Sequence, residues 1–183
     1  MPLPPTVDRE ELHLRRIEMR GYRRTDGLYD IEARLTDTKT HALPRDEGMV
    51  EPGEALHDMW LRLVVDKDLL VHDALAVTDA SPHRICPEAT AGLARIKGLR
   101  IGSGWTRAIK ERFAGSQGCT HLTELLGPLA TTAFQTLTAL RLARPDTLDD
   151  DGRPNKIDSC YAYGSERAVV LHKWPAFYDG PKP

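Results

Sequence analysis

The sequence lacks the features that mark several large classes of protein. Its formal net charge is only −2, so no basic excess indicates a nucleic-acid partner. No apolar run approaches the roughly 18 residues that cross a bilayer. Residues 1–5 carry neither a basic flank nor an apolar stretch, which predicts no signal peptide. We therefore expect a cytoplasmic protein that binds neither nucleic acid nor membrane.

Cysteine and aromatic residues are scarce as well. Three cysteines, an odd number, indicate a reducing cytoplasm rather than a disulfide framework, and aromatic residues make up only 6% of the chain. The P-loop, GxGxxG, HExxH and GxSxG patterns are missing from the sequence, as are internal repeats. Nucleotide binding and the common hydrolase designs therefore lose support.

Hydrophobic periodicity predicts strands in the first half of the chain and helices in the second. Asp26-Gly27 is a signal for a two-residue hairpin turn, and clean alternation follows it. The expected strands are residues 12–24, 28–38, 59–65 and 70–78. The expected helices are residues 86–97, 105–113 and 120–141, the last with Pro128 inside it. This order predicts an α+β fold, with an antiparallel β-sheet of about four strands followed by three helices packed on one face.

Composition divides the chain into three parts. Residues 1–10 are expected to form an extended, proline-rich lead, and residues 11–144 a single α+β domain. Residues 145–183 are polar and turn-rich, with one expected strand at 168–171. We expect this tail to pack back on the domain. Whether it covers its own site or that of a neighbour stays open, and a homo-oligomer is one alternative.

Two of the three cysteines stand at expected helix starts. Cys86 precedes a proline that suits the first helical position, and Cys119 lies two residues before His121. The free N–H groups and dipole of a helix N-terminus lower the pKa of a thiol, which makes it reactive or able to bind a metal. The alternative is that both thiols are small buried hydrophobes and that His121 packs in the core or supports the helix start.

The first hairpin crowds charged and tyrosine side chains together. Asp30 and Glu32 share one strand face, where each carboxylate raises the pKa of the other unless an arginine neutralises them. Arg15, Arg23 or Arg34 are expected to do so. The functional interpretation is a carboxylate base beside an arginine that holds an anionic or phenolic substrate. The alternative is a solvated, salt-bridged sheet face.

The tail contains an unusual aromatic segment. Tyr161 and Tyr163 follow Cys160, and polar linkers rarely carry such a run. We expect this segment to cover the site as a lid, with a plain edge strand as the alternative.

Three segments of the chain together form a specific pattern. They are Tyr22-Arg23-Arg24-x-Asp26-Gly27-Leu28-x-Asp30-Ile31-Glu32-Ala33 with Asp37-Thr38-Lys39, Gly118-Cys119-Thr120-His121-Leu122-x-Glu124-Leu125, and Asp158-Ser159-Cys160-Tyr161. In this order they resemble the bacterial domain-of-unknown-function family number 2889. That family name implies almost nothing about function.

The arrangement is also similar, more distantly, to iron–sulfur scaffold proteins of the NifU/IscU type, which place an antiparallel sheet before helices. In that resemblance Cys86 matches a strand-to-helix turn and Cys119 the start of a late helix. The third ligand position falls near Asp37, where this chain has no cysteine, and His121 follows the late cysteine instead of preceding it. The resemblance implies that Cys86, Cys119 and the Asp37 hairpin converge. A metal-binding or sulfur-handling protein would use these residues with His121, and zinc or an iron–sulfur cluster is the alternative cofactor.

Chains similar to the first family are associated with bacterial breakdown of lignin-derived aromatic dimers, including a lyase that releases formaldehyde. The resemblance implies acid–base carbon–carbon cleavage of a small aromatic substrate without a cofactor. The expected catalytic residues are Tyr22, Arg23, Asp30, Glu32 and His121, with Asp30 or Glu32 as the base. The expected substrate-binding residues are Arg34, Cys86, Cys119 and Tyr161. A metal or iron–sulfur binding protein and a non-catalytic ligand-binding module are the alternatives.

Overall fold

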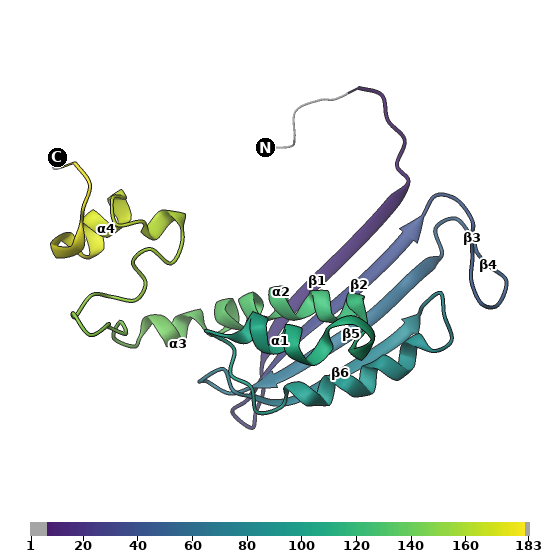
Figure 1. Ribbon diagram of the computed structural model, residues 1–183, viewed down its shortest axis with the longest axis horizontal. Helices are drawn as coiled ribbons and strands as arrows, with labels where there is room; N and C mark the ends of the chain where they lie inside the picture. The colour runs from purple at the N-terminus through teal and green to yellow at the C-terminus, as the bar shows by residue number, and fades with distance from the viewer. Residues whose placement is uncertain (1–6, 182–183) are drawn as a thin grey trace. The chain divides into compact units, whose positions relative to one another are not determined.

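The computed structural model describes residues 7–181, which fall into two compact units divided after Thr138. The first unit contains a four-stranded antiparallel sheet in the order β1-β2-β5-β6 (Figure 1). Its strands are β1 (His13–Arg23), β2 (Tyr29–Lys39), β5 (Ala55–Val65) and β6 (Val71–Ala80). A small hairpin, β3 (Leu43–Pro44) with β4 (Met49–Val50), lies in the loop between β2 and β5. Strands precede helices along the chain, so the predicted α+β class is confirmed.

The turn between β1 and β2 is longer than the predicted two residues. The strands pair from Arg23 with Tyr29, and the backbone N–H of Arg24 donates to the carbonyl of Leu28 at 2.9 Å. Gly27 supplies the positive φ of 87° that this turn requires. The longer turn sets the register of the hairpin, and therefore which side chains of β1 face those of β2.

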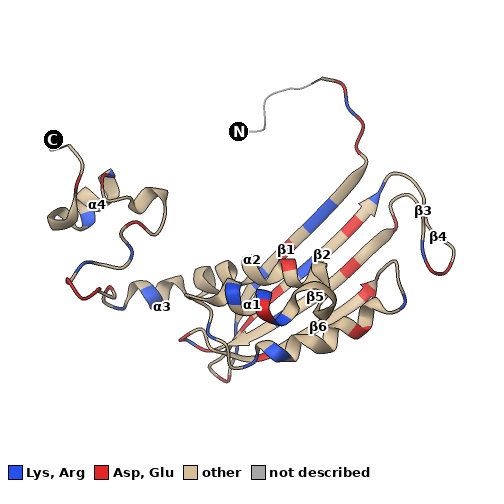
Figure 2. Ribbon diagram, in the orientation of Figure 1, with Lys and Arg blue, Asp and Glu red and all other residues tan. Residues whose placement is uncertain are grey.

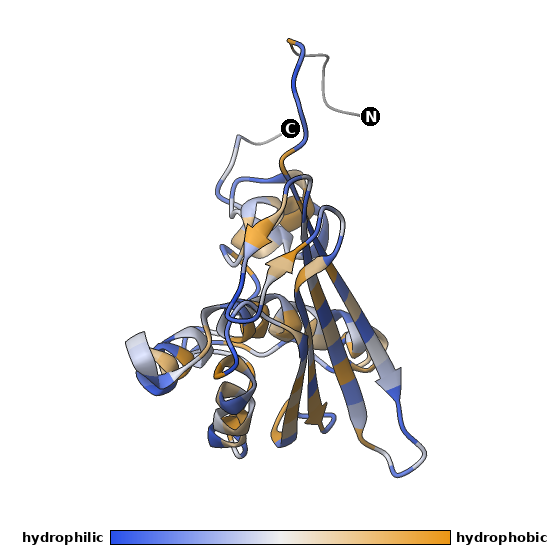
Figure 3. Cartoon of the chain, turned by 90° about the vertical axis from the view of Figure 1, so that its right-hand side faces the viewer, coloured by the Kyte–Doolittle hydropathy of each residue, from blue (hydrophilic) through white to orange (hydrophobic). Residues whose placement is uncertain are grey.

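Alternation along β2 separates a buried inner face from a partly exposed outer face. The alternating hydrophobic and hydrophilic segments of the strands are visible in Figure 3. The inner face carries Ile31, Ala33 and Leu35, whose side chains are fully buried, and continues to Asp37. A polar residue thus occupies a core position at one end of an apolar strand face.

The helices of the first unit are η1 (Cys86–Ile96, a 3₁₀ helix), α1 (Trp105–Phe113) and α2 (Thr120–Thr136). Helix α2 lies against β1, β2 and β5, and buries a leucine stripe that includes Leu122 and Leu126. Segment η1 runs beside β6. Helix α1 contacts α2, where the indole N–H of Trp105 donates to the Leu126 carbonyl at 3.1 Å. The predicted stripe is the one that holds α2 to the sheet.

The predicted helix over residues 120–141 is wrong in one respect. Leu137 separates α2 from a short helix, α3 (Thr138–Leu142), so the helix is interrupted. Pro128 does not cause this interruption, since it lies inside α2 on the exposed side. Gly127 precedes the proline and has no Cβ, so one of the clashes that disfavour a helical residue before proline is absent.

The second unit holds the short helices η3 (Tyr161–Tyr163), α4 (Ala168–Lys173) and η4 (Pro175–Phe177). The strand predicted at residues 168–171 is wrong, because α4 occupies that segment. A four-residue apolar run fits a helix or a strand equally well, and Val170 is buried here in helical form. The packing of this tail on the first unit stays a prediction.

The first six residues of the predicted lead lie outside the described residues, and residues 7–10 carry neither helix nor strand. Within the described part of the chain, the helices fall short of the length and apolar character that crossing a membrane requires.

Candidate functional site

Asp37 is a buried carboxylate with four hydrogen-bond donors around it. Its side chain is only 2% exposed. Oδ1 accepts from Nε2 of His13 and from Nε of Arg15, both at 2.8 Å. Oδ2 accepts from Nη2 of Arg15 at 2.9 Å and from Nδ1 of His57 at 3.0 Å. These bonds fill the acceptor positions of the carboxylate, as a buried charge requires.

Strand register brings these groups together. Arg15 on β1 is directly opposite Asp37 on β2, and Asp37 is directly opposite His57 on β5. Directly opposite residues have Cβ atoms about 5 Å apart, which is hydrogen-bonding range for long side chains. The three residues form a polar row across the inner face of three adjacent strands.

The charge state of Asp37 fixes the proton on its neighbours. Burial by itself raises the pKa of the Asp37 carboxyl, but hydrogen bonds from Arg15 and His13 outweigh it and hold that pKa well below its usual range. Asp37 is therefore an anion at neutral pH and only accepts hydrogen bonds. It follows that Nδ1 of His57 carries a proton. Burial, together with the proximity of His121, lowers the pKa of His57, so its Nε2 is left unprotonated.

His121 lies beside His57 at the start of α2. The helix begins at Thr120 with Cys119 as its N-cap, and this places His121 in the first turn. The two imidazole centroids are 3.9 Å apart and the rings are tilted by 37°. Burial and then the charge of Arg15 lower the pKa of His121, while Asp37 and Glu124 oppose the shift. His121 is therefore also neutral at pH 7.

Arg15 ties the helix start to the sheet. Its Nη1 donates to Oε2 of Glu124 at 2.9 Å, while its other donors bind Asp37. One guanidinium thus links β1, β2 and α2. This arrangement fixes the position of His121 relative to His57.

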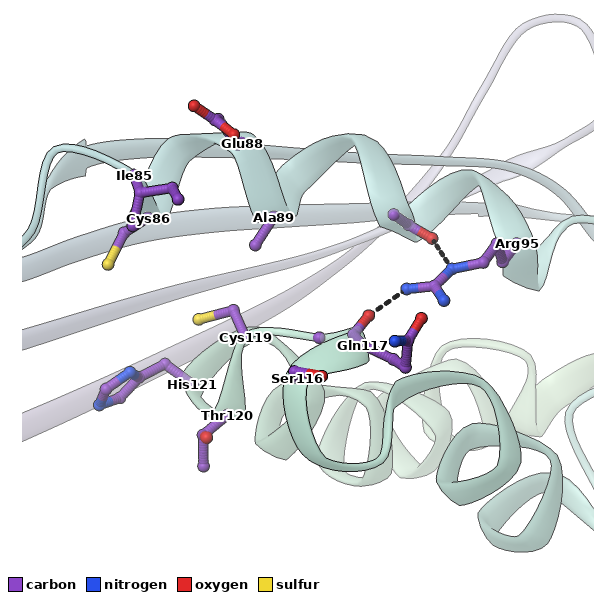
Figure 4. Close-up of a pocket in the computed structure, with 12 residues that line it drawn as sticks. Ile85, Cys86, Glu88, Ala89, Arg95, Ser116, Gln117, Cys119, Thr120 and His121 are labelled. Carbon is purple, nitrogen blue, oxygen red and sulfur yellow. Dashed lines mark hydrogen bonds between the residues drawn. The ribbon is translucent and has the colours of Figure 1, made fainter.

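A pocket of about 550 Å³ opens beside His121 (Figure 4). Cys86 at the start of η1 and Cys119 at the start of α2 contribute sulfur atoms to it from opposite sides, as the close-up shows. Both thiols are free and half-buried. Arg95 stands farther along the pocket and donates to the carbonyls of Gly92 and Gln117. The structure therefore brings Cys86, Cys119 and His121 to one cavity.

The side chains that best match a metal site are not the predicted set. The ligand atoms of Asp37, His57 and His121 all lie within 4.8 Å of one another, and this group includes neither Cys86 nor Cys119. Two histidines and one carboxylate are a common ligand set for divalent metals. However, the acceptor positions of Asp37 are already filled, two of them by a guanidinium that would repel a cation. The cluster is therefore better suited to proton transfer than to a metal ion.

Asp30 and Glu32 lie on the outer face of β2, the opposite face from Asp37. Nη1 of Arg24 donates to Asp30 at 3.2 Å, and Nε of Arg62 donates to Glu32 at 2.7 Å. The two carboxylates are thus parts of the salt-bridged sheet face that the sequence offered as the alternative. The structure does not bring them together with His121.

The arginines expected to neutralise these carboxylates have other partners. Arg15 pairs with Asp37 on the inner face. Arg34 pairs with Asp58 at 2.6 Å. The predicted pairing is wrong for both, because the strand register decides which charges meet.

The remaining predicted residues are two at the end of β1 and one in the second unit. Tyr22 is opposite Asp30 on the outer face, and Arg23 ends β1 opposite Tyr29. Tyr161 belongs to the second unit, is 80% exposed, and stacks with Arg167 at 4.3 Å. Neither Tyr22 nor Arg23 lines the pocket beside His121, and the lid expected from Tyr161 stays a prediction.

His13 and His57 are site residues that the sequence analysis missed. His57 stands outside the strand predicted at residues 59–65, since β5 begins four residues earlier at Ala55. A histidine in an apolar alternation with Met59, Leu61 and Leu63 was the available signal.

Acid should destabilise the fold through His57 and His121, the two histidines whose pKa values are lowered. Because their folded-state pKa values lie below the ordinary value of about 6.5, the unfolded chain binds protons that the folded chain refuses. Stability is then full above that value and falls as pH drops below it, while the contribution of Asp37 is lost only below its unfolded value of about 4. We expect the free energy of unfolding, measured with urea, to fall from about pH 7.5 to about pH 5.

The His121→Gln variant should show a smaller loss over this range. His41 is exposed, so the His41→Gln variant should match the wild-type protein. A stability that rises toward acid, or a loss of equal size in His121→Gln, would contradict the assigned charge states.

Comparison with known proteins gives one match. A family described as "Protein of unknown function (DUF2889)" matches residues 13–135, which include the whole sheet, the polar row, both pocket cysteines and His121. No curated protein and no solved structure matches the chain, so the NifU/IscU resemblance is not shown. The match covers well over half of the sequence and agrees with the resemblance seen in its motifs. The chain therefore belongs to the DUF2889 family.

Proposed function

We propose that this protein is a lyase that cleaves a carbon–carbon bond of a small aromatic substrate by acid–base chemistry, with His121 as the proton-transfer group. The observation that carries this proposal is the hydrogen bond from Nδ1 of His57 to buried Asp37, with the neutral ring of His121 stacked on His57 at the pocket. Asp30 and Glu32 lose the role of base, because their carboxylates are paired on the other face of the sheet.

His121 has the properties of a general base. It is neutral at pH 7 because burial and Arg15 disfavour its charged form. Asp37 and Glu124 stabilise the imidazolium that forms when it takes a proton. A neutral imidazole beside carboxylates that stabilise its charged form can accept a proton, as a general base must. His57 acts as a positioning residue, because Asp37 holds its ring and its ring holds His121.

The reaction needs one proton acceptor and no redox step. The base takes the hydroxyl proton of a hydroxymethyl group, and the bond between that carbon and the substrate breaks. The carbon leaves as formaldehyde, and the electron pair restores the aromatic ring of a quinone methide, which the phenolic substrate forms beforehand by expelling water from its phenol proton and a benzylic hydroxyl. The ring regains the proton as a phenol, so atoms and electrons balance. This reaction class comes from the family resemblance, and the site contributes the proton transfer.

The volume and the lining of the pocket are suited to a small aromatic ligand. Its volume of about 550 Å³ lies within the usual range of small-molecule sites. Ile85 and Ala89 give it an apolar wall, and Cys86 and Cys119 add polarisable sulfur. We further propose that η1, α1 and α2 together form the layer over the inner face of the sheet, with this pocket at its edge.

Formaldehyde release from a panel of phenolic dimers tests the activity. We expect release by the wild-type protein and a loss of roughly 10²- to 10⁴-fold in the His121→Gln variant. The exposed His41→Gln variant is the matched control and should keep full activity. No release by folded protein would count against the lyase, whereas release that survives His121→Gln would count against the site.

Metal binding is the second candidate, and the mutual distances of Asp37, His57 and His121 favour it. The metal and acid-labile sulfide content of anaerobically purified protein separates the two. A stoichiometric metal that disappears in the His57→Ala variant would replace the acid–base proposal. Metal that disappears only in Cys86→Ala and Cys119→Ala would return the site to the two thiols.

A further inference from the structure

The outer face of the sheet carries an apolar strip on two adjacent strands. Trp60 on β5 is directly opposite Val77 on β6, and Leu75 lies two residues before Val77 on the same face. Their side chains are 39%, 53% and 51% exposed, respectively. Together with Arg62 and Glu32 they line a groove of about 480 Å³. Single exposed apolar residues are ordinary, but a contiguous strip marks an interaction surface.

The arginines that border this strip are already paired within the chain. Both Nε and Nη2 of Arg34 donate to Asp58, at 2.9 and 2.6 Å. The Arg34 guanidinium also stacks on the Trp60 ring at 4.8 Å. Arg62 is paired with Glu32, where Nε and Nη2 both meet Oε1. Figure 2 shows acidic and basic residues interspersed along these strands.

An apolar strip bordered by paired arginines favours one kind of binding partner over others. A nucleic acid or an anionic membrane would require unpaired cations, and the arginines beside the strip are engaged. A matching surface must be apolar at its centre and electrically balanced around it, so that no charge is buried without a partner. A second copy of the same face has both properties.

The size of the face is also sufficient. Four strands of 10 or 11 residues make a surface of roughly 36 by 19 Å at the usual rise and spacing of strands. That footprint is comparable to the ~800 Å² that each partner buries in a standard interface. Two sheets that pack face to face through a two-fold axis are a common arrangement.

We propose that the chain forms a two-fold dimer through the outer faces of two sheets, centred on Trp60, Leu75 and Val77. The pocket stays open in such a dimer, since Asp37 lies on the inner face. The dimer is therefore independent of the proposed lyase activity, and either can fail without the other.

Sedimentation velocity of the full chain over a range of concentrations tests this proposal. We expect the wild-type protein to show twice the mass of one chain. The Leu75→Glu and Val77→Glu variants each place a carboxylate near its own symmetry mate, so the dissociation constant should rise at least about tenfold. Met49 on β4 is also an exposed apolar residue, so Met49→Glu is the matched control and should leave the dimer intact.

Circular dichroism should show that all three variants are folded. A wild-type protein that is monomeric at every concentration would overturn the proposal, as would a dimer that survives both outer-face substitutions. A monomer in which Leu75→Glu increases hydrogen exchange within residues 139–183 would also overturn it, and would assign the face to the chain's own second unit.

Discussion

The Asp37→Asn variant is expected to lose about 3 kcal/mol of unfolding free energy, because it removes the buried anion of a charge network and leaves buried partners uncompensated. The amide would keep the shape of the carboxylate but present N–H groups to donors. Because one of the two oxygens becomes an NH2 group, Arg15 and one of the two histidines would face a donor where each now has an acceptor. Urea denaturation at neutral pH measures this loss.

A matched carboxylate is available on the other face of the sheet. Asp58 accepts two hydrogen bonds from Arg34. That ion pair is partly exposed, and it does not position a histidine ring as Asp37 positions His57. The Asp58→Asn variant should lose no more than about 1 kcal/mol. Equal losses in the two variants would show that Asp37 has no special place in the fold. Activity should separate them too, since only Asp37→Asn removes the partner that holds His57.

The Gly21→Ala variant is expected to lose about 2–3 kcal/mol, as overpacked cores do. Gly21 faces α2 from the inner side of β1, and an added Cβ would lie 1.8 Å from Oγ1 and 2.7 Å from Cβ of Thr136. A threonine side chain is short and branched, so it has no flexible end that moves away. Either β1 or α2 must shift. Gly102 has open space around it, so Gly102→Ala is the control and should change stability by less than about 0.5 kcal/mol.

The clash can be tested directly with a double variant. Thr136→Gly removes the three atoms nearest to the new methyl group. In the Gly21→Ala/Thr136→Gly protein, the two losses should therefore be less than additive by at least about 1 kcal/mol. Additive losses would show that the close approach of β1 and α2 does not limit this position.

The extent and the buried face of β2 could be predicted from the sequence, and with them the burial of Asp37. Alternation through Ile31, Ala33 and Leu35 defines the buried face, and two residues farther along that face is Asp37. A carboxylate in the register of a core strand is an informative signal, because it is rarely buried without partners.

The hydrogen-bond partners of Asp37 could not be predicted from the sequence, for two physical reasons. A two-residue turn at Asp26-Gly27 would pair Arg15 with Thr38, whereas the observed longer turn pairs it with Asp37. A one-residue change of register moves every side chain to the other face. His57 lies on β5, which is separated from β2 by a loop of 15 residues, and a bulge interrupts the pairing of the two strands beside Asp37. No local sequence signal fixes the register between β2 and β5.

The two candidate sites of the sequence had different outcomes for a similar reason. Cys86 and Cys119 were placed at helix starts, which local signals mark well, and the two meet at one pocket. Asp30 and Glu32 were predicted as catalytic because many charged residues stand close together in that hairpin. The number of charged residues in a segment does not show which face of the sheet their side chains occupy. Arg24 and Arg62 neutralise them on the outer face, away from His121.

The protonation of His57 and His121 tests the central claim most directly, and needs no substrate. Nitrogen-15 NMR of the imidazoles, assigned with the His57→Gln and His121→Gln variants, reports both the tautomer and the titration. We predict that His57 is neutral at pH 7 with its proton on Nδ1, and that the pKa values of both histidines lie below the ordinary value of about 6.5. A doubly protonated His57 at pH 7, or a neutral ring with its proton on Nε2, would contradict the account.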